Sequence, residues 1–176
     1  MASEDPTPGG GSAAALAVAM SVALSAMVAR GSPDWPEARA AAVQAETLRA
    51  RVGPLIQLDA ELYEEALASL RLPQYTEAEV RSAAIRGALE RAAEAPLLIA
   101  EAAADAACLA AEVVERGTAD RKGDAVAAVF LAEGAAKAAA RLVAVNLIMS
   151  PQDQRVQRAD SAAKTASEAA QRAVES

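Results

Sequence analysis

The chain has no histidine, one cysteine and only four aromatic residues among its 176 positions. Without histidine, the usual zinc sites are excluded, as are Ser-His-Asp and Cys-His catalysis. We therefore expect no metal site, and any acid–base chemistry must use carboxylates, lysine, tyrosine or water. Cys108 has no second cysteine with which to form an internal disulfide, and its alanine-rich surroundings favour a small core residue over a nucleophile.

Alanine takes the place of the missing residue types. It accounts for 51 of the 176 residues, within an apolar fraction of 53%. Sandwiches and barrels need β-branched and aromatic side chains, whereas alanine is the best helix former and lets helix axes approach closely. The composition predicts an all-α fold, an antiparallel bundle of about five to six helices in a single domain spanning residues 1–176.

The charge balance is acidic, with 24 Asp and Glu against 17 Lys and Arg, and the formal net charge is −7. Proteins that bind nucleic acid gain affinity by neutralising phosphates with basic side chains. The net charge has the wrong sign for that, so no nucleic-acid partner is expected.

One segment tests the expectation of a soluble protein, because residues 6–29 form a run of 24 residues without a charge. The run is long enough to cross a bilayer. Its small side chains give little transfer energy, and Glu4 and Asp5 precede it where a signal peptide carries positive charge. We expect a buried central helix of a cytoplasmic protein that does not bind membranes; a membrane-associated helix is the alternative.

Glycine and proline mark the other expected boundaries. Residues 1–11 form a polar leader that we expect to be flexible, and Ser12 is placed as the N-cap of a helix running to about Arg30. Gly53 and Pro54 end or kink the next helix, and Pro96 is expected to kink a third. Residues 151–176 form a polar tail that is expected to be helical.

Asp59 is the first candidate functional residue. It lies within a stripe of Leu55, Leu58 and Leu62, with Tyr63 one turn further on. At the margin of a buried face, desolvation would raise the pKa of this carboxyl. Periodicity by itself favours the alternative, a solvated carboxylate among neighbouring glutamates.

Three further features have a functional and a structural interpretation. Gly9, Gly10 and Gly11 could present backbone N–H groups to an anion at a helix N-terminus, or simply form the flexible leader. Asp124 could bind a ligand, or stabilise the dipole of its helix from the first turn. Asn146 lies between apolar residues, where an interhelical hydrogen bond is the usual role.

Together these landmarks resemble a known family. The opening from Pro6 to Ser12, followed by a small-residue helix, is similar to the opening motif of the formiminotransferase-cyclodeaminase C-terminal domain family, which includes methenyltetrahydrofolate cyclohydrolases. The resemblance continues over about residues 5–150. It includes the segments that begin at Asp59, Arg71, Ala95, Gly117 and Val145.

The resemblance implies an all-helical homodimer that acts on one-carbon adducts of tetrahydrofolate, as a cyclodeaminase or a methenyltetrahydrofolate cyclohydrolase. The family's proposed catalytic aspartate falls on Asp59. Substrate-binding roles are implied for Gly9, Gly10, Gly11, Ser12, Tyr63, Asp124 and Asn146. The folate is the substrate and no cofactor is required. The alternative is a non-catalytic helical dimer of this fold that binds a small anionic metabolite or a protein.

Helix geometry adds a constraint on two of these residues. Asp124 and Asn146 are expected on one helix, 22 residues apart, which separates them by about 33 Å at a rise of about 1.5 Å per residue. They cannot line one small site in a single subunit. A symmetric dimer could bring the opposite ends of two such helices together.

Overall fold

The computed structural model describes residues 7–73 and 77–175, and these form helices without any strand. The predicted all-α class is confirmed. The elements in chain order are α1 (Gly10–Arg30), α2 (Ala38–Val52), α3 (Leu55–Leu70), α4 (Ala78–Ala92), α5 (Glu94–Arg116), the short 3-10 helix η1 (Ala119–Arg121), α6 (Lys122–Asn146) and α7 (Gln154–Glu175).

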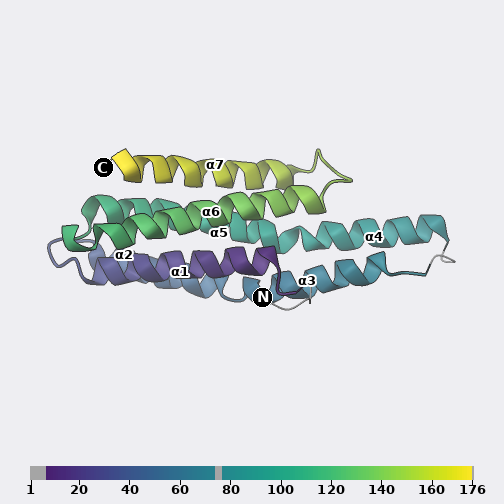
Figure 1. Ribbon diagram of the computed structural model, residues 1–176, viewed down its shortest axis with the longest axis horizontal. Helices are drawn as coiled ribbons and strands as arrows, with labels where there is room; N and C mark the ends of the chain where they lie inside the picture. Colours follow the sequence, from purple (N-terminus) through teal and green to yellow (C-terminus); the bar gives the residue numbers. More distant parts are fainter. Residues whose placement is uncertain (1–6, 74–76, 176) are drawn as a thin grey trace.

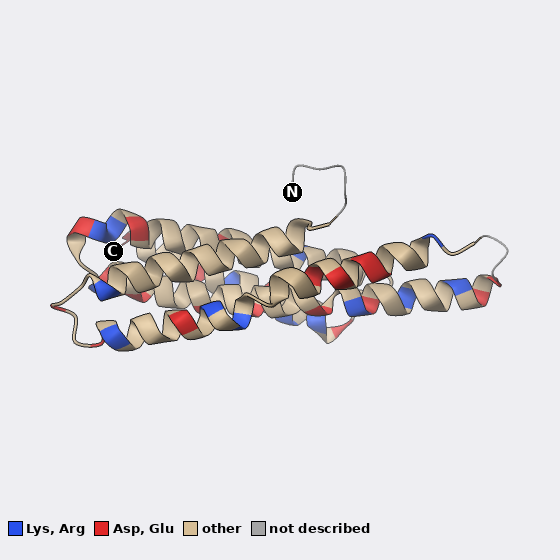
Figure 2. Ribbon diagram, turned by 90° about the horizontal axis from the view of Figure 1, so that it is seen from below, with Lys and Arg blue, Asp and Glu red and all other residues tan. Residues whose placement is uncertain are grey.

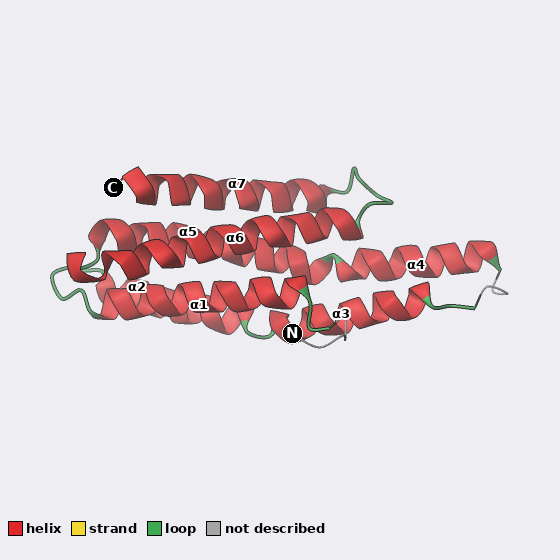
Figure 3. Ribbon diagram, in the orientation of Figure 1, coloured by secondary structure: helices red, strands yellow, loops and turns green. Residues whose placement is uncertain are grey.

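Five helices form the body of the molecule. Figure 1 shows α1, α2, α5, α6 and α7 side by side along the long axis, with α7 on the outside over α5 and α6. Along the chain, α1 and α2 run in opposite directions, and so do α5, α6 and α7 in turn (Figures 1 and 3). The body is thus an antiparallel bundle joined by short loops.

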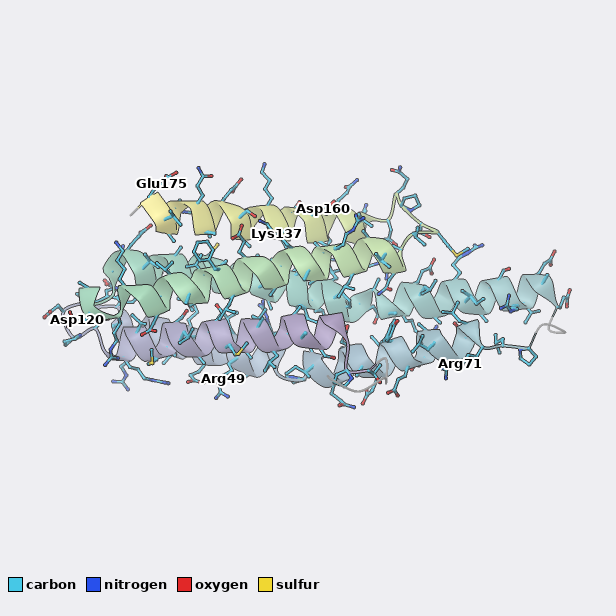
Figure 4. All side chains as sticks on the ribbon, in the orientation of Figure 1. Arg49, Arg71, Asp120, Lys137, Asp160 and Glu175 are labelled. Atoms are coloured by element: carbon cyan, nitrogen blue, oxygen red, sulfur yellow. The ribbon has the colours of Figure 1, made fainter. Side chains whose placement is uncertain are left out.

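The remaining two helices, α3 and α4, pair with each other and extend beyond one end of the body as an arm (Figure 1). Helix α3 continues the direction of α2, and α5 continues that of α4 (Figure 3). In Figure 4, Arg71 lies on the arm and Asp120 at the opposite end of the molecule. The bases of α3 and α4 lie beside the start of α1 and the end of α6, and this junction is where the candidate site forms.

The core consists mainly of alanine and valine. Helix α1 contributes Val18, Val22 and Val28, each with no exposed surface, and Ile99 of α5 is equally buried. Small side chains let the helices approach closely, so many of the alanines serve as core residues. Helix α1 is long and apolar enough to cross a membrane by length and composition, and 56% of its most apolar window is buried inside the protein.

Three local expectations are wrong. Cys108 is exposed on α5 and is not a core residue. Ser12 does not cap α1, because Gly9 occupies the N-cap position and the helix begins at Gly10. The expected leader over residues 1–11 therefore ends earlier: Gly10 and Gly11 are helical, and the Thr7 hydroxyl donates a hydrogen bond of 2.7 Å to Glu64. Residues 1–6 of this leader lie outside the described part of the chain.

The expected breaks near proline fall close to their predicted positions. Gly53 and Pro54 separate α2 from α3. The break before Pro96 lies at Ala93, three residues earlier, because Pro96 occupies the first turn of α5, where proline's missing N–H would have no partner within that helix. The expected helical tail is present as α7.

Candidate active site

Asp59 is held in the first turns of α3 by the start of α1. The backbone N–H of Ser12 donates to Asp59 Oδ2 at 2.8 Å. The Ser12 hydroxyl oxygen lies 3.2 Å from the same carboxylate oxygen and 2.9 Å from the carbonyl oxygen of Ile56. The positive end of α1 thus faces a carboxylate of the same chain.

The Asp59 side chain lies largely out of water, since only 9% of the residue is exposed. Burial raises the pKa of its carboxyl above the ordinary value, and the hydrogen bonds from Ser12 offset part of that rise. No ion pair involves Asp59 among the described residues. Of the two interpretations drawn from the sequence, the structure favours the desolvated carboxylate.

Gly11 makes this close approach possible. A Cβ atom at position 11 would overlap the carboxylate of Asp59, so no other residue fits without moving α3 or the side chain. At Gly10 the same atom would meet only the Leu142 side chain, at 3.7 Å, which is ordinary contact. Gly11 is therefore required for packing against Asp59, a role distinct from anion binding.

A cavity of about 210 Å³ opens beside Asp59. Five helices and the segment before α1 contribute to its wall. Among the predicted site residues, Asp59, Tyr63 and Asn146 line it together with the glycines. The complete lining is Gly9, Gly10, Gly11, Asp59, Tyr63, Ala92, Pro96, Leu142, Val145 and Asn146.

Two predicted site residues lie elsewhere. Ser12 is buried behind the carboxylate, which it holds in place, and it does not line the cavity. Asp124 lies in the first turn of α6, exposed to solvent, whereas Asn146 is the last residue of the same helix. The structure thus does not bring Asp124 into the cavity of its own subunit.

Sequence reasoning missed the part of the wall formed by Ala92, Leu142 and Val145, and it considered Pro96 only as a kink. The sequence did contain an indication that Pro96 needs a compensating contact, because proline has no backbone N–H group. That group would otherwise donate to the carbonyl of Ala92, four residues earlier. Instead, Asn146 Nδ2 donates to the Ala92 oxygen at 2.8 Å.

A larger and more open groove of about 870 Å³ lies between the end of α1 and α2, with Trp35 in its wall. Two of its charged groups, Arg30 and Glu46, already form an ion pair at 2.8 Å. None of the predicted site residues lines it. The smaller cavity combines enclosure with a desolvated carboxylate, and it is the better candidate for chemistry.

Comparison with known proteins places this chain in a family. The family model described as formiminotransferase-cyclodeaminase matches residues 1–171. This chain belongs to that family. The resemblance inferred from the opening motif and the order of landmarks is confirmed.

Two known proteins are similar to this chain. A methenyltetrahydrofolate cyclohydrolase of Methylorubrum extorquens is 35% identical over 155 residues, which cover 83% of this chain and 74% of that protein. The structure of formiminotetrahydrofolate cyclodeaminase from Thermotoga maritima matches with a TM-score of 0.86 over 99% of this chain and 89% of the other, at 21% identity. The second likeness shows a shared fold.

Proposed function

We propose that this protein is a folate one-carbon enzyme that hydrolyses methenyltetrahydrofolate, with Asp59 as the proton carrier. The observation that carries the proposal is the cavity itself: Asp59 is the only charged residue among the described residues that line it. An uncompensated, desolvated carboxylate suits a cationic substrate, and the methenyl group is a cation. The 35% identity to a cyclohydrolase supports this reaction.

In this reaction a water molecule adds to the methenyl carbon between two folate nitrogens. Asp59, when ionised, attracts the cationic substrate into the cavity and accepts a proton from the water as it attacks. The tetrahedral carbon, which now carries a hydroxyl group, then collapses to a formyl group, and the hydroxyl proton is released to water as the net proton of the reaction. As one carbon–nitrogen bond breaks, the carboxylic acid returns its proton to the leaving nitrogen.

The raised pKa of Asp59 suits both halves of this cycle. A carboxyl with an ordinary pKa is a weak acid catalyst at neutral pH, because it is almost entirely ionised. Desolvation shifts the pKa upward, towards the operating pH, so that the same group can take up and release a proton. No histidine, metal or other cofactor is needed for these steps.

Cyclodeamination is the second candidate, favoured by the fold shared with the Thermotoga maritima enzyme. It passes through the same tetrahedral carbon but expels ammonia to form the methenyl group. Asp59 would then protonate the leaving amine. The same carboxylate thus serves either reaction, and the substrate distinguishes them.

The decisive experiment follows the methenyl chromophore with purified protein. Loss of the chromophore from the methenyl substrate indicates hydrolysis, whereas its appearance from the formimino substrate, with ammonia, indicates cyclodeamination. Asp59→Asn is expected to lower kcat by about 10²- to 10⁴-fold. The control is Asp160→Asn on the exposed face of α7. Equal rates for wild type and Asp59→Asn would refute the assignment.

We further propose that the active form is a soluble cytoplasmic homodimer. A cavity of about 210 Å³ is smaller than the roughly 300–1,000 Å³ typical of small-molecule pockets, so a folate must extend beyond it. A second subunit could enlarge the site. Its opposite end would supply the region of Asp124, which the single subunit keeps away from the cavity.

The surface for such a dimer lies on α1 and α6. Leu16, Met20 and Met27 of α1 are 43%, 45% and 39% exposed, and Phe130 of α6 is 48% exposed. Figure 2 shows α1 almost entirely in the colour of uncharged residues. Exposed apolar side chains aligned on one helix are typical of a surface that a second copy covers.

A further inference from the structure

The break between α4 and α5 is held by one side chain from α6 and one from α7. Neither side chain takes part in the proposed chemistry. Pro96 has no N–H, so the carbonyl oxygen of Ala92 lacks its usual donor four residues ahead. Ala92 is buried, with only 4% of the residue exposed. Asn146, at the end of α6, supplies the missing donor through Nδ2 at 2.8 Å.

A second contact comes from the start of α7. Arg155 Nη1 donates to the carbonyl oxygen of Glu90 at 2.7 Å, in the last turn of α4. Asp153 orients this guanidinium through two contacts, Nε to Oδ1 at 3.1 Å and Nη2 to Oδ2 at 2.8 Å. A cation at the C-terminal carbonyls of α4 is also favourable with respect to the helix dipole.

These contacts matter for the cavity because Ala92, Pro96 and Asn146 all line it. Movement of the α4–α5 break would move the wall formed by Ala92 and Pro96. Besides these hydrogen bonds, α3 packs on the start of α1, whereas α4 makes few contacts with α5 and α6. The carbonyls of Glu90 and Ala92 are therefore points at which the body can fix the arm.

We propose that Asn146 and Arg155 are positioning residues that hold the α4–α5 break by its carbonyl oxygens and thereby set the wall of the Asp59 cavity. Asn146 replaces the backbone donor that Pro96 lacks. Arg155 makes α7, which contributes no residue to the cavity, necessary for its shape. The effect on turnover rests on the proposed folate function; the effect on the break does not.

The test for Asn146 uses Pro96→Ala, which restores an N–H group that can donate to Ala92. In the wild-type background, Asn146→Ala leaves a buried carbonyl unsatisfied, and we expect Tm to fall by roughly 2–6 °C. We expect kcat to fall about ten- to hundredfold as the wall shifts. In the Pro96→Ala background, both losses should be less than half as large.

The outcomes of this double-mutant cycle distinguish the positioning role of Asn146 from the proposed folate function. Equal losses of Tm in both backgrounds would refute the positioning role. Recovery of Tm without recovery of kcat would also refute it, because Asn146 would then contact the substrate directly. If the wild-type protein turns over neither folate, the proposed function fails, while the Tm coupling still decides whether Asn146 replaces the proline donor.

The test for Arg155 compares Arg155→Met with Arg158→Met on the same helix. Arg158 contacts the Glu101 side chain at 2.6 Å and no backbone carbonyl of the break. Arg155→Met should speed amide hydrogen exchange at residues 90–95 about tenfold or more and lower kcat/KM, with partial rescue by Arg155→Lys. Arg158→Met should change neither measurement. Similar exchange in the two Met variants would overturn the role of Arg155.

Discussion

Asp59 combines features that are costly for stability and useful for catalysis. Its carboxyl is buried, hydrogen-bonded from one side by Ser12, and has no cation paired with it among the described residues. Placing a charge in such a position destabilises a folded protein. This local cost in stability thus falls on the residue that we propose as the proton carrier.

Asp59→Asn is expected to increase stability while it removes activity. Burial raises the pKa of Asp59 in the folded protein above its value in the unfolded chain. The contribution of Asp59 to the free energy of unfolding is therefore fully present below the unfolded pKa of about 3.9, and it is lost as the pH rises through the folded pKa. The asparagine variant lacks this loss. Urea unfolding from pH 4 to pH 8 should show the variant gaining on wild type as pH increases; a constant difference would contradict the burial argument.

Gly11→Ala should damage both folding and activity, because its Cβ overlaps Asp59. Overpacking of this kind costs about 1–3 kcal/mol, and relief requires that the carboxylate move. Gly10→Ala is the adjacent control and should remain within about 1 kcal/mol of wild type. Thermal unfolding of the two variants checks this, and equal Tm values would show that Asp59 moves freely.

At the scale of elements, the α4–α5 break and the start of α7 decide the shape of the site. Each is held by polar side chains on backbone carbonyls, whereas the body of the bundle is held by alanine packing. Hydrogen bonds have a defined direction and apolar contacts do not. Polar contacts can therefore fix the place at which a helix ends or bends. The body also contains such a contact, from the buried Ser21 hydroxyl to the carbonyl oxygen of Ala128 at 2.7 Å.

The Asp153–Arg155 pair should show a defined acid dependence. Arg155 lowers the pKa of Asp153 to about 2, so the pair stabilises the protein above the unfolded pKa of about 3.9, and this contribution is lost as the pH falls through about 2. Asp153→Asn keeps a hydrogen-bonding side chain but removes the charge. Its Tm should be below that of wild type at pH 7, and the two should converge near pH 2.

Asp160→Asn, on the same helix but exposed to solvent, is the matched control for that titration. A Tm difference between Asp153→Asn and wild type that stayed unchanged from pH 7 to pH 2 would show that charge is not the cause.

At the scale of the whole molecule, the body and the arm differ in how they are supported. The body surrounds α5 with four other helices, whereas the arm consists of two helices packed on each other (Figure 1). The cavity lies where the two parts meet. The body also has an exposed apolar face on α1 and α6, which we propose is covered by a second copy of the chain.

A charge on that face should therefore separate the subunits. Met20 is already 45% exposed, so Met20→Glu should cost less than about 1 kcal/mol in an isolated subunit. In the dimer it would be buried without a partner and should convert the protein to a monomer. Val174→Glu is the control on α7, where the side chain is 65% exposed. Sedimentation velocity distinguishes the outcomes, and a monomeric wild type would refute the dimer.

The all-helical class, the order of the helices and their approximate ends were predictable because they depend on local features. These features are the alanine content, the positions of proline and glycine, and the spacing of apolar residues. Asp59 was selected by the family resemblance, whereas the spacing of apolar residues by itself favoured a solvated carboxylate at this position. The role of Ser12 was not predictable, because a serine before a helical run is equally suited to capping and to a distant carboxylate. Its true partner, Asp59, is 47 residues away in the chain.

The sequence by itself therefore determined the helical class, the approximate helix boundaries and the family resemblance that points to Asp59, since these follow from short-range patterns and motifs. The tertiary structure decided that Asp59 is desolvated, that Gly11 must lack a side chain, that Asn146 satisfies the carbonyl exposed by Pro96, and that Asp124 lies away from the cavity of its own subunit. Each of these depends on which helix faces meet, and that is settled by packing over the whole chain.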